Sequence, residues 1–498
     1  MEPFDFTHPQ RQSTKGILVI FGFNLYKFLK RFFVLLLAFG LSLSKKNSFF
    51  NLSQAHIIVI TIVILLIILA VAVLMYLNFK YYVTKDDFHL SRGIINKEKT
   101  VIPKSKIQNV YIKQNLLQQI INVVSVNIET AGDDKSEIEI SALDKNIALE
   151  LKKQLFVKRL SETEDEAVMT HDKKIFFKAS PIRLLLEGLS QNHFKSFLII
   201  MSFFFGLYYE FKEYLEDFNI QERIEGTVQL ESDSILNFVI ANLIVIFLVV
   251  IISSLFSVVK TFIVNFDLEV IEHQKRIEIN KGLINKVSLS LTPSRIQNLV
   301  VKTNRLKRYL GLYTVSVKQA MVSAKQRKSF VIVALAKYQV SELIHKLVEN
   351  YNSTLRKYKP EWYYNRISAI EMFIMILVFN IPAYFVFGSE KWWINCVLFP
   401  IAVGYIYLSY KKAYYQIDDD FVTVGSGVID TTTTILEIHK IQSVEFKQSI
   451  FQKRRKIASV IISTASKDTK IPYINESKAF SIYNFLLYRV ETQNKNWM

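Results

Sequence analysis

Basic side chains are the residues whose type and spacing most clearly suggest a chemistry in this sequence, namely the binding of anions. Between Lys281 and Phe330 there are 11 Lys or Arg residues and no Asp or Glu. A second basic run, Lys453 to Lys456, lies at the matching place further along the chain. We take nine residues as the candidate site for an anionic lipid or an acidic partner: Arg295, Lys302, Arg305, Lys307, Arg308, Lys453, Arg454, Arg455 and Lys456.

Three explanations of this basic excess stay open. Near an anionic lipid surface, each basic residue gains on the order of 1 kcal/mol within a Debye length. Nucleic acid is the competing anion, and the formal net charge of +18 permits it. However, aromatic residues for base stacking are sparse near the basic loop, where only Tyr309 and Tyr313 occur. The third explanation is the general excess of Lys and Arg on the cytoplasmic side of membranes, with no specific ligand.

The sequence shows no pattern of an enzyme beside these residues. The eight histidines do not cluster at ligand spacing. There is no H-E-x-x-H, C-x-x-C, P-loop or G-x-S-x-G motif. The run from Asp418 to Asp420 resembles a set of metal ligands, but a solvated turn before a strand explains it better. We therefore expect a protein that is not an enzyme and that needs no cofactor or metal, with an enzyme that lacks a recognised motif as the alternative.

The basic residues belong to a 25-residue pattern that occurs three times without a gap, at residues 107–131, 296–320 and 441–465. Each copy opens with an Ile-Gln pair, and a lysine follows the Ile by six positions. A glycine lies 14 residues before each Ile. The repeated residues are Gln108, Gln297 and Gln442; Lys113, Lys302 and Lys447; and Gly93, Gly282 and Gly427. The chain is therefore one module used three times.

The repeated glutamine and lysine have different interpretations. At the start of a strand, a glutamine amide can satisfy backbone groups, so we favour a structural role for it over ligand binding. Two roles of the repeated lysine stay open: it either ends a strand in solvent or contacts phosphate. In the turn that follows, Asn122, Gly311 and Lys456 align. We expect these three residues to occupy one turn, where glycine in the second copy indicates a positive φ or a tight approach.

Hydropathy indicates that the modules follow membrane-spanning segments. Half of the residues are hydrophobic, and the mean hydropathy is +0.21. Two uncharged segments, 57–79 and 235–259, are long enough to cross about 30 Å of hydrocarbon. Two more, 372–389 and 392–410, are just long enough. Two shorter runs, 32–44 and 196–209, need a basic side chain that snorkels at one end. We expect six spans, two before each module, and the alternative is four spans with two hairpins that dip into the membrane.

Charge predicts the orientation of these spans. The span ends next to the modules carry Lys80, Lys260, Lys411 and Lys412, whereas the loop 210–233 has eight acidic residues. The positive-inside rule then places both termini and all three modules in the cytoplasm. The single cysteine, Cys396, allows no internal disulfide, which fits a reducing compartment.

The expected organisation follows from the repeats and the spans. Residues 1–80 hold an amphipathic helix at 16–31 and the first span pair, followed by the first module at 81–160. Residues 161–260 hold a linker and the second span pair, followed by the second module at 261–352. Residues 353–412 hold a linker and the third span pair, followed by the third module at 413–498.

Each module reads as antiparallel strands closed by a helix. In the first copy, β-rich runs at 88–92 and 94–102 flank Gly93, and 107–113 and 124–130 have strand patterns. A short helical turn is expected at 116–121. Leucine and isoleucine four residues apart predict a helix at 142–157. The fold class is therefore α+β, an antiparallel sandwich or barrel with one closing helix.

This order of elements resembles the bacterial pleckstrin-homology-like (bPH2-type) domain of membrane proteins. Three copies behind helix pairs resemble the long, three-module members of that family. The resemblance implies a split seven-stranded antiparallel β fold with a capping helix, and it implies no known catalytic residues. It also implies a second membrane subunit as partner, a single-module relative.

We therefore expect a non-enzymatic, multi-pass protein of a bacterial cytoplasmic (inner) membrane. It would display three cytoplasmic modules as a scaffold, or to bind lipid headgroups, peptides or each other, in envelope maintenance or defence. We do not expect a nucleic acid partner. The alternative is a transport, export or lipid-handling component. The few polar residues inside the spans, Asn242, Asn380 and Asn395, argue against a path for hydrophilic solutes.

Overall fold

The computed structural model describes residues 4–33, 54–130, 137–156, 174–193, 235–273, 276–291, 293–319, 330–348, 354–387 and 395–493, with a few single positions between them. The chain divides into two compact units. The first comprises Met1–Lys174 with Glu278–Ser290, and the second comprises Ile175–Ile277 with Leu291–Met498. Both units combine antiparallel sheets with helices, so the predicted α+β class is confirmed.

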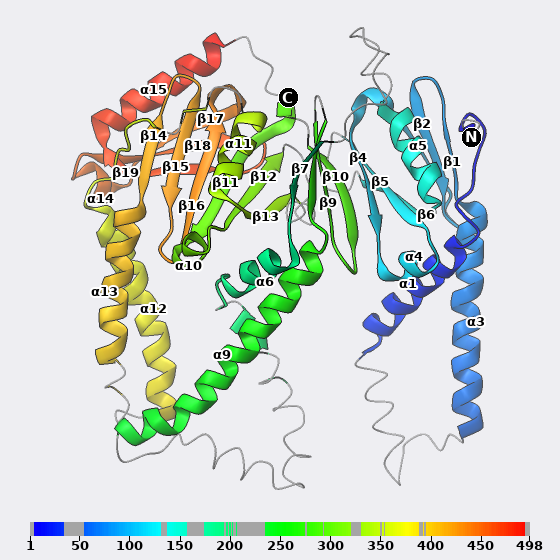
Figure 1. Cartoon of the computed structure of the whole chain (residues 1–498), viewed down its shortest axis with the longest axis horizontal. Coiled ribbons are helices and arrows are strands. Elements are labelled where there is room, and N and C mark those ends of the chain that lie inside the picture. The colour runs from blue at the N-terminus through cyan, green and yellow to red at the C-terminus, as the bar shows by residue number, and fades with distance from the viewer. Residues whose placement is uncertain are drawn as a thin grey trace. The chain divides into compact units, whose positions relative to one another are not determined.

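The first unit holds the first module and the helices that precede it (Figure 1). Its strands form a sheet β1-β2-β3 and a second sheet in which β6, β5 and β4 are neighbours. Its elements are α1 (Gly16–Arg31), α3 (Gln54–Asn78), β1 (Lys80–Val83), β2 (Asp87–Arg92), β3 (Glu98–Pro103), β4 (Ile107–Gln114), α4 (Leu116–Ile120), β5 (Val124–Thr130), β6 (Glu137–Leu143) and α5 (Lys145–Phe156).

The second unit holds most of the second module and all of the third. The elements of the second module are β7 (Lys174–Lys178), α6 (Pro181–Leu189), α9 (Ile235–Asn265), β8 (Glu269–His273), β9 (Arg276–Lys281), β10 (Lys286–Leu291), β11 (Ile296–Asn304), α10 (Arg305–Tyr309), β12 (Tyr313–Gln319), β13 (Val331–Leu335) and α11 (Lys337–Leu347). Those of the third are α12 (Tyr364–Phe387), α13 (Asn395–Lys412), β14 (Tyr414–Ile417), β15 (Phe421–Ser426), β16 (Asp430–Glu437), β17 (Ile441–Lys447), α14 (Ile450–Lys453), β18 (Ile457–Thr464), β19 (Thr469–Asn475) and α15 (Glu476–Thr492).

The apolar faces of the strands and the closing helices form the module cores. Val126 lies in β5, which is buried on both faces, and Val315 and Val460 take the same place in β12 and β18. All three valines are fully buried. In the first module Val126 shares the core with Leu151 of α5, and in the third module Val460 shares the core with Leu486 of α15. The stripe on each closing helix therefore covers the sheets, as its spacing predicts.

The three repeats share one strand register, as their gapless alignment predicts. Ile107 pairs with Thr130, Ile296 with Gln319, and Ile441 with Thr464. In every copy the register shifts directly after the Ile, so the repeated glutamine is the extra residue of a β-bulge. The glutamine thus repeats at a fixed irregularity of the strand, in keeping with a structural role.

Two turns recur with the same backbone conformation. Asn122, Gly311 and Lys456 have φ values of 56°, 67° and 55°, so the prediction for this turn is confirmed. The repeated glycines before each module's third strand have φ values of 110° to 111°. A Cβ atom on Gly282 would lie 2.0 Å from the carbonyl oxygen of Asn285, so a side chain does not fit there. In the first copy this turn extends through residue 97, and β3 begins at Glu98 instead of at residue 94, where the sequence predicted it.

Neighbouring modules are joined edge to edge, which the sequence did not predict. In the first unit β10 pairs antiparallel with β4, and Lys286 lies opposite Gln114. In the second unit β16 pairs antiparallel with β11, and Leu436 lies opposite Asn298. The third strand of one module thus extends the second sheet of the module before it.

The predicted spans are described in part. Among the described residues, one helix is long and apolar enough to cross a membrane, Ala55–Asn78, and Val250–Asn265 is a shorter apolar helix. The helices α12 and α13 overlap the segments predicted at 372–389 and 392–410, and α12 begins eight residues earlier than the predicted segment. Most of the predicted segment at 32–44, much of that at 196–209 and all of the acidic loop at 210–233 lie outside the described residues. The count of six spans stays a prediction.

Candidate functional site

The candidate basic residues gather around short helices that occupy the same place in every module. These helices, α4, α10 and α14, follow the strands β4, β11 and β17. A side-chain oxygen caps each one: Asn115 accepts from the backbone N–H of Gln118, Asn304 from that of Lys307, and Ser449 from that of Gln452. The caps hold helices that would be too short to form alone.

The third residue of these helices differs between the copies. Gln118 and Gln452 each accept a hydrogen bond from the backbone of their capping residue, which completes a capping box. The second module has Lys307 there, and its Nζ lies 2.5 Å from Oε1 of Glu187 and 3.0 Å from Oγ1 of Thr314. The Glu187 side chain is fully buried and that of Lys307 is 9% exposed. Lys307 is therefore an internal charge whose partner lies on α6, and it does not belong to an exposed basic surface.

The two arginines of α10 form the first exposed basic surface. Arg305 and Arg308 are both exposed. Burial, and then the positive charges of Arg305 and Arg308, lower the pKa of Lys412. Lys412 ends α13, two residues beyond the predicted span that closes at Tyr410. The carboxylate of Asp430 acts in the opposite direction on Lys412. Two exposed arginines therefore lie near Lys412 at the end of a predicted membrane helix, a place where an anion would be stabilised.

The four basic residues at α14 form the second exposed basic surface. Lys453, Arg454, Arg455 and Lys456 are all exposed. The guanidinium of Arg455 lies 5.2 Å from the ring centroid of Tyr363, which directly precedes α12. Figure 1 shows α14 beside the ends of α12 and α13. This basic run is thus next to the start of α12, the helix that contains most of the predicted span at 372–389.

The structure does not bring all nine candidates together. Arg295 is half-buried and directly precedes β11, whereas α10 follows the far end of that strand. Lys302 is exposed near that far end, between Thr314 and Thr432 on the flanking strands. Arg305 and Arg308 form one surface, with the half-buried Lys412 near it, and residues 453–456 form the other. In the sequence, Lys412 indicates only the orientation of a span, and no local pattern places it near α10.

Exposed apolar side chains accompany the short helices, and the sequence argument did not single them out. On α14, Ile450 and Phe451 are 77% and 70% exposed. On α10, Tyr309 is 88% exposed, and on α4, Ile120 is 75% exposed. Three equivalent helices that each present apolar side chains mark a contact surface rather than scattered exposure. The first module has apolar residues at α4 without the cluster of basic residues.

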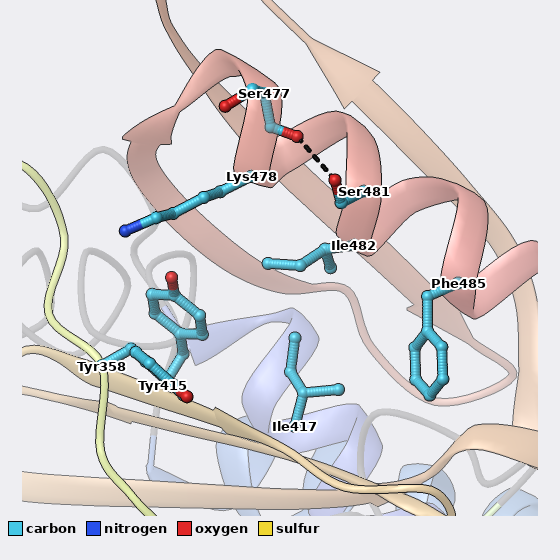
Figure 2. Close-up of a pocket in the computed structure, with 8 residues that line it drawn as sticks. All are labelled: Tyr358, Tyr415, Ile417, Ser477, Lys478, Ser481, Ile482 and Phe485. Atoms are coloured by element: carbon cyan, nitrogen blue, oxygen red, sulfur yellow. Dashed lines mark hydrogen bonds between the residues drawn. The ribbon is translucent and has the colours of Figure 1, made fainter.

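The third module contains a groove. It has a volume of about 440 Å³ and lies between β14 and α15. Figure 2 shows Ile417 and Ile482 facing each other across it, with Lys478 near one end. The side-chain hydroxyl of Ser481 donates to the carbonyl oxygen of Ser477, 3.0 Å away, within its own helix. This lining offers an apolar surface and no acid–base pair.

The acidic run Asp418 to Asp420 forms the turn that the sequence predicted. The backbone N–H of Asp418 donates to the carbonyl oxygen of Phe421 at 2.9 Å. Arg489 of α15 donates to the carbonyl oxygen of Asp419 at 2.7 Å, which ties the turn to the closing helix. Within the described part of the chain, no three His, Cys, Asp or Glu side chains group as metal ligands would.

Comparison with known proteins gives a family match and a relative. The family model of the bacterial PH domain, bPH_2, matches residues 32–158, 224–350 and 373–490. The chain is 23% identical over 417 residues to the UPF0699 transmembrane protein YdbT of Bacillus subtilis (strain 168). This alignment covers 79% of the chain and 81% of the relative. Each family match contains one copy of the repeat with its short helix.

Proposed function

This chain belongs to the bacterial PH domain family, bPH_2, and on that premise we propose that it is a membrane protein whose modules bind the anionic surface of their own bilayer. The relative YdbT is named a transmembrane protein, which supports a membrane location. The modules would act as a non-enzymatic scaffold, held against the lipid by the tips of their short helices. Maintenance or defence of a bacterial envelope is the biological role that this activity would serve.

The observation that carries the proposal is the pairing of exposed apolar and basic side chains at α14, beside the start of α12. An apolar side chain such as Phe451 gains about 1.5 to 3 kcal/mol when it is fully buried, and part of that gain is available in the interfacial layer of a bilayer. A basic neighbour such as Arg454 adds on the order of 1 kcal/mol near anionic lipid. The same pairing recurs at α10, with Tyr309 and Arg308.

We propose a multi-pass topology with six spans, with both termini and all modules on the cytoplasmic side of the inner membrane. The basic surfaces at α10 and α14 support this orientation, because the cytoplasmic leaflet carries negative surface potential. The partner that we propose is another membrane protein with a module of the same family. Nucleic acid is not part of this proposal, because the exposed basic surfaces at α10 and α14 lie near the ends of α12 and α13, the helices that overlap predicted spans.

A conduit through the spans is the alternative function, and one contact weakens it. Asn380 of α12 and Asn395 of α13 exchange hydrogen bonds of 2.9 and 2.8 Å. Two amides that satisfy each other hold a helix pair together and offer little to a passing solute. This contact therefore favours anchoring as the role of the third helix pair.

Neutralising the exposed arginines should strongly reduce the preference for anionic lipid. We expect Arg→Gln changes at positions 305, 308, 454 and 455 of the full chain to reduce lipid enrichment about fivefold for each arginine, or about 30-fold at each surface of two arginines, since one basic residue contributes on the order of 1 kcal/mol. The measurement is the ratio of phosphatidylglycerol to phosphatidylethanolamine retained after mild detergent extraction, quantified by mass spectrometry. The changed residues are Arg305, Arg308, Arg454 and Arg455.

The matched control removes the same number of charges from the closing helices, through Lys→Gln changes at exposed positions of α5, α11 and α15. This variant should retain the wild-type lipid ratio. An equal loss in both variants would indicate general attraction by net charge, and no loss in either would refute the proposed site. The control residues are Lys145, Lys153, Lys337 and Lys478.

A further inference from the structure

Two outer strands of this chain, β3 and β17, correspond to strands that pair between modules elsewhere in the chain. Each joint pairs the third strand of one module with the fourth strand of the module before it, β10 with β4 and β16 with β11. The corresponding strands that remain are β3 of the first module and β17 of the third. Both are outer strands of three-stranded sheets, in the orders β1-β2-β3 and β17-β18-β19.

The two joints follow one register. Lys286, ten residues before the Ile of its repeat, pairs with Gln114, seven residues after the Ile of the preceding repeat. Leu436, five residues before its Ile, pairs with Asn298, two residues after the preceding Ile. The offset is three residues in both joints. A rule that holds twice in one chain gives a definite register for any third joint of this kind.

We propose that β17 of one copy of this chain pairs antiparallel with β3 of a second copy, in that same register. The rule then places Lys447 opposite Glu98 and Val444 opposite Val101. Each chain would carry one donor edge and one acceptor edge, so the contact is head-to-tail. Because the joint repeats a relation found between modules of one chain, successive chains would enter the membrane in the same direction.

Residues of β3 and β17 are more exposed than the equivalent residues of the strands that pair between modules. Val101 of β3 is 54% exposed, whereas Ile435 at the same place in β16 is 2% exposed within its joint. Ser443 of β17 is exposed, whereas Asn298 at the same place in β11 is 2% exposed. The residues that become buried on joining are therefore those that these two edges present to solvent.

Charge at the two edges is complementary. Glu98 currently pairs with Arg92 across its own hairpin at 2.9 Å, at a surface where such a pair contributes little. Lys447 is exposed, and after the effect of burial its positive charge further lowers the pKa of Lys470. A carboxylate opposite Lys447 would relieve that repulsion. The repeated lysine thus lies opposite Val287 and Thr432 in the internal joints and would face an acid in the proposed one.

Disulfide trapping between two tagged full-length copies tests the proposal. One copy carries Glu98→Cys and the other Lys447→Cys, both in a Cys396→Ala background, and oxidant is added to isolated membranes. Opposite residues of antiparallel strands have Cα atoms about 4.5 to 5.5 Å apart, within the range that a disulfide spans. We expect a product of twice the chain mass that contains both tags and disappears on reduction.

The matched control replaces Glu98→Cys by Lys99→Cys, which points to the other face of the strand. It should yield at least about tenfold less product, because a one-residue slip reverses the side chain. No product from the Glu98–Lys447 pair, equal product from the control, or a product with a different membrane protein would each overturn pairing between copies. A disulfide formed only within one chain that carries both changes would overturn it as well.

Charge exchange gives an independent readout without cysteine. Glu98→Lys or Lys447→Glu alone places like charges opposite each other, and each should lower the fraction of oligomer in mild detergent. The double variant restores an opposite pair and should recover the wild-type fraction. Failure of the double variant to recover, when both single variants are impaired, would show that these residues do not meet.

Discussion

Replacing Lys307 with methionine should lower the free energy that protects the second module from opening by about 3 to 5 kcal/mol. The change leaves the carboxylate of Glu187 buried without the ammonium that lies 2.5 Å from it. Burying an unpaired charge costs far more than the pair contributes. Hydrogen exchange of peptides from β11 and β12, measured by mass spectrometry on the full chain, reports this local free energy.

Two variants control this prediction. Arg308→Met, one position along the same helix, changes an exposed residue and should alter exchange by less than about 0.5 kcal/mol. The double variant Lys307→Met with Glu187→Gln removes both charges and should recover most of the loss. If Lys307→Met exchanges like the wild type, the buried pair does not hold α6 to this module.

Replacing Lys281 with methionine should abolish a rise of on the order of 3 kcal/mol in the stability of the β9–β10 hairpin between about pH 7 and pH 10.5, since one unit of pKa corresponds to about 1.4 kcal/mol. Lys281 is 6% exposed. Burial lowers its pKa from 10.5 to about 8. The charged form is thus disfavoured in the folded state, and methionine keeps the length of the side chain without that cost.

The pH dependence gives the sign of this effect. Between pH 8 and 10.5 the unfolded chain binds more protons at Lys281 than the folded protein does, so wild-type stability rises with pH across this window. Below it, both states are protonated and the full cost of burial remains. The methionine variant should lack this rise, and Lys286→Met, at an exposed position of the same hairpin, should keep it. A wild-type hairpin with no gain in protection between about pH 7 and pH 10 would contradict this assignment.

The repeated elements could be predicted from the sequence because their causes are local. Gly282 marks a turn that excludes a side chain, and the β-rich runs around Val126 and Val315 form strands with these valines in the core. The positive φ of Lys456 followed from alignment with Gly311. In each case the residues that decide the conformation lie within a few positions of one another, so a single repeat contains the information.

The joints and the buried pair could not be predicted because their partners are distant in sequence. The run Thr431 to Thr434 of β16 has the polarity of a solvated strand, yet it pairs with β11 more than 120 residues earlier. Lys307 reads as one more cation of a basic loop, and only the placement of Glu187 on α6 shows that it is internal. The exposure of the apolar residues at α14 could not be predicted either. Phe451 next to basic residues also fits an amphipathic helix whose apolar face is buried, and only the structure shows that Phe451 is exposed.

The most direct test of membrane contact places a reporter on the tip of α14. Phe451→Cys in a Cys396→Ala background is labelled with an environment-sensitive dye in inside-out membrane vesicles, and quenchers are supplied either in the lipid or in water. Glu491→Cys, exposed near the end of α15 that lies away from α12 and α13, is the control (Figure 1). We predict that lipid-borne quencher reaches the dye at 451 and not at 491, and that an impermeant thiol reagent labels neither position in intact cells. Quenching at 451 only from the aqueous phase, or labelling of either position in intact cells, would contradict binding of the modules to the inner face of their own membrane.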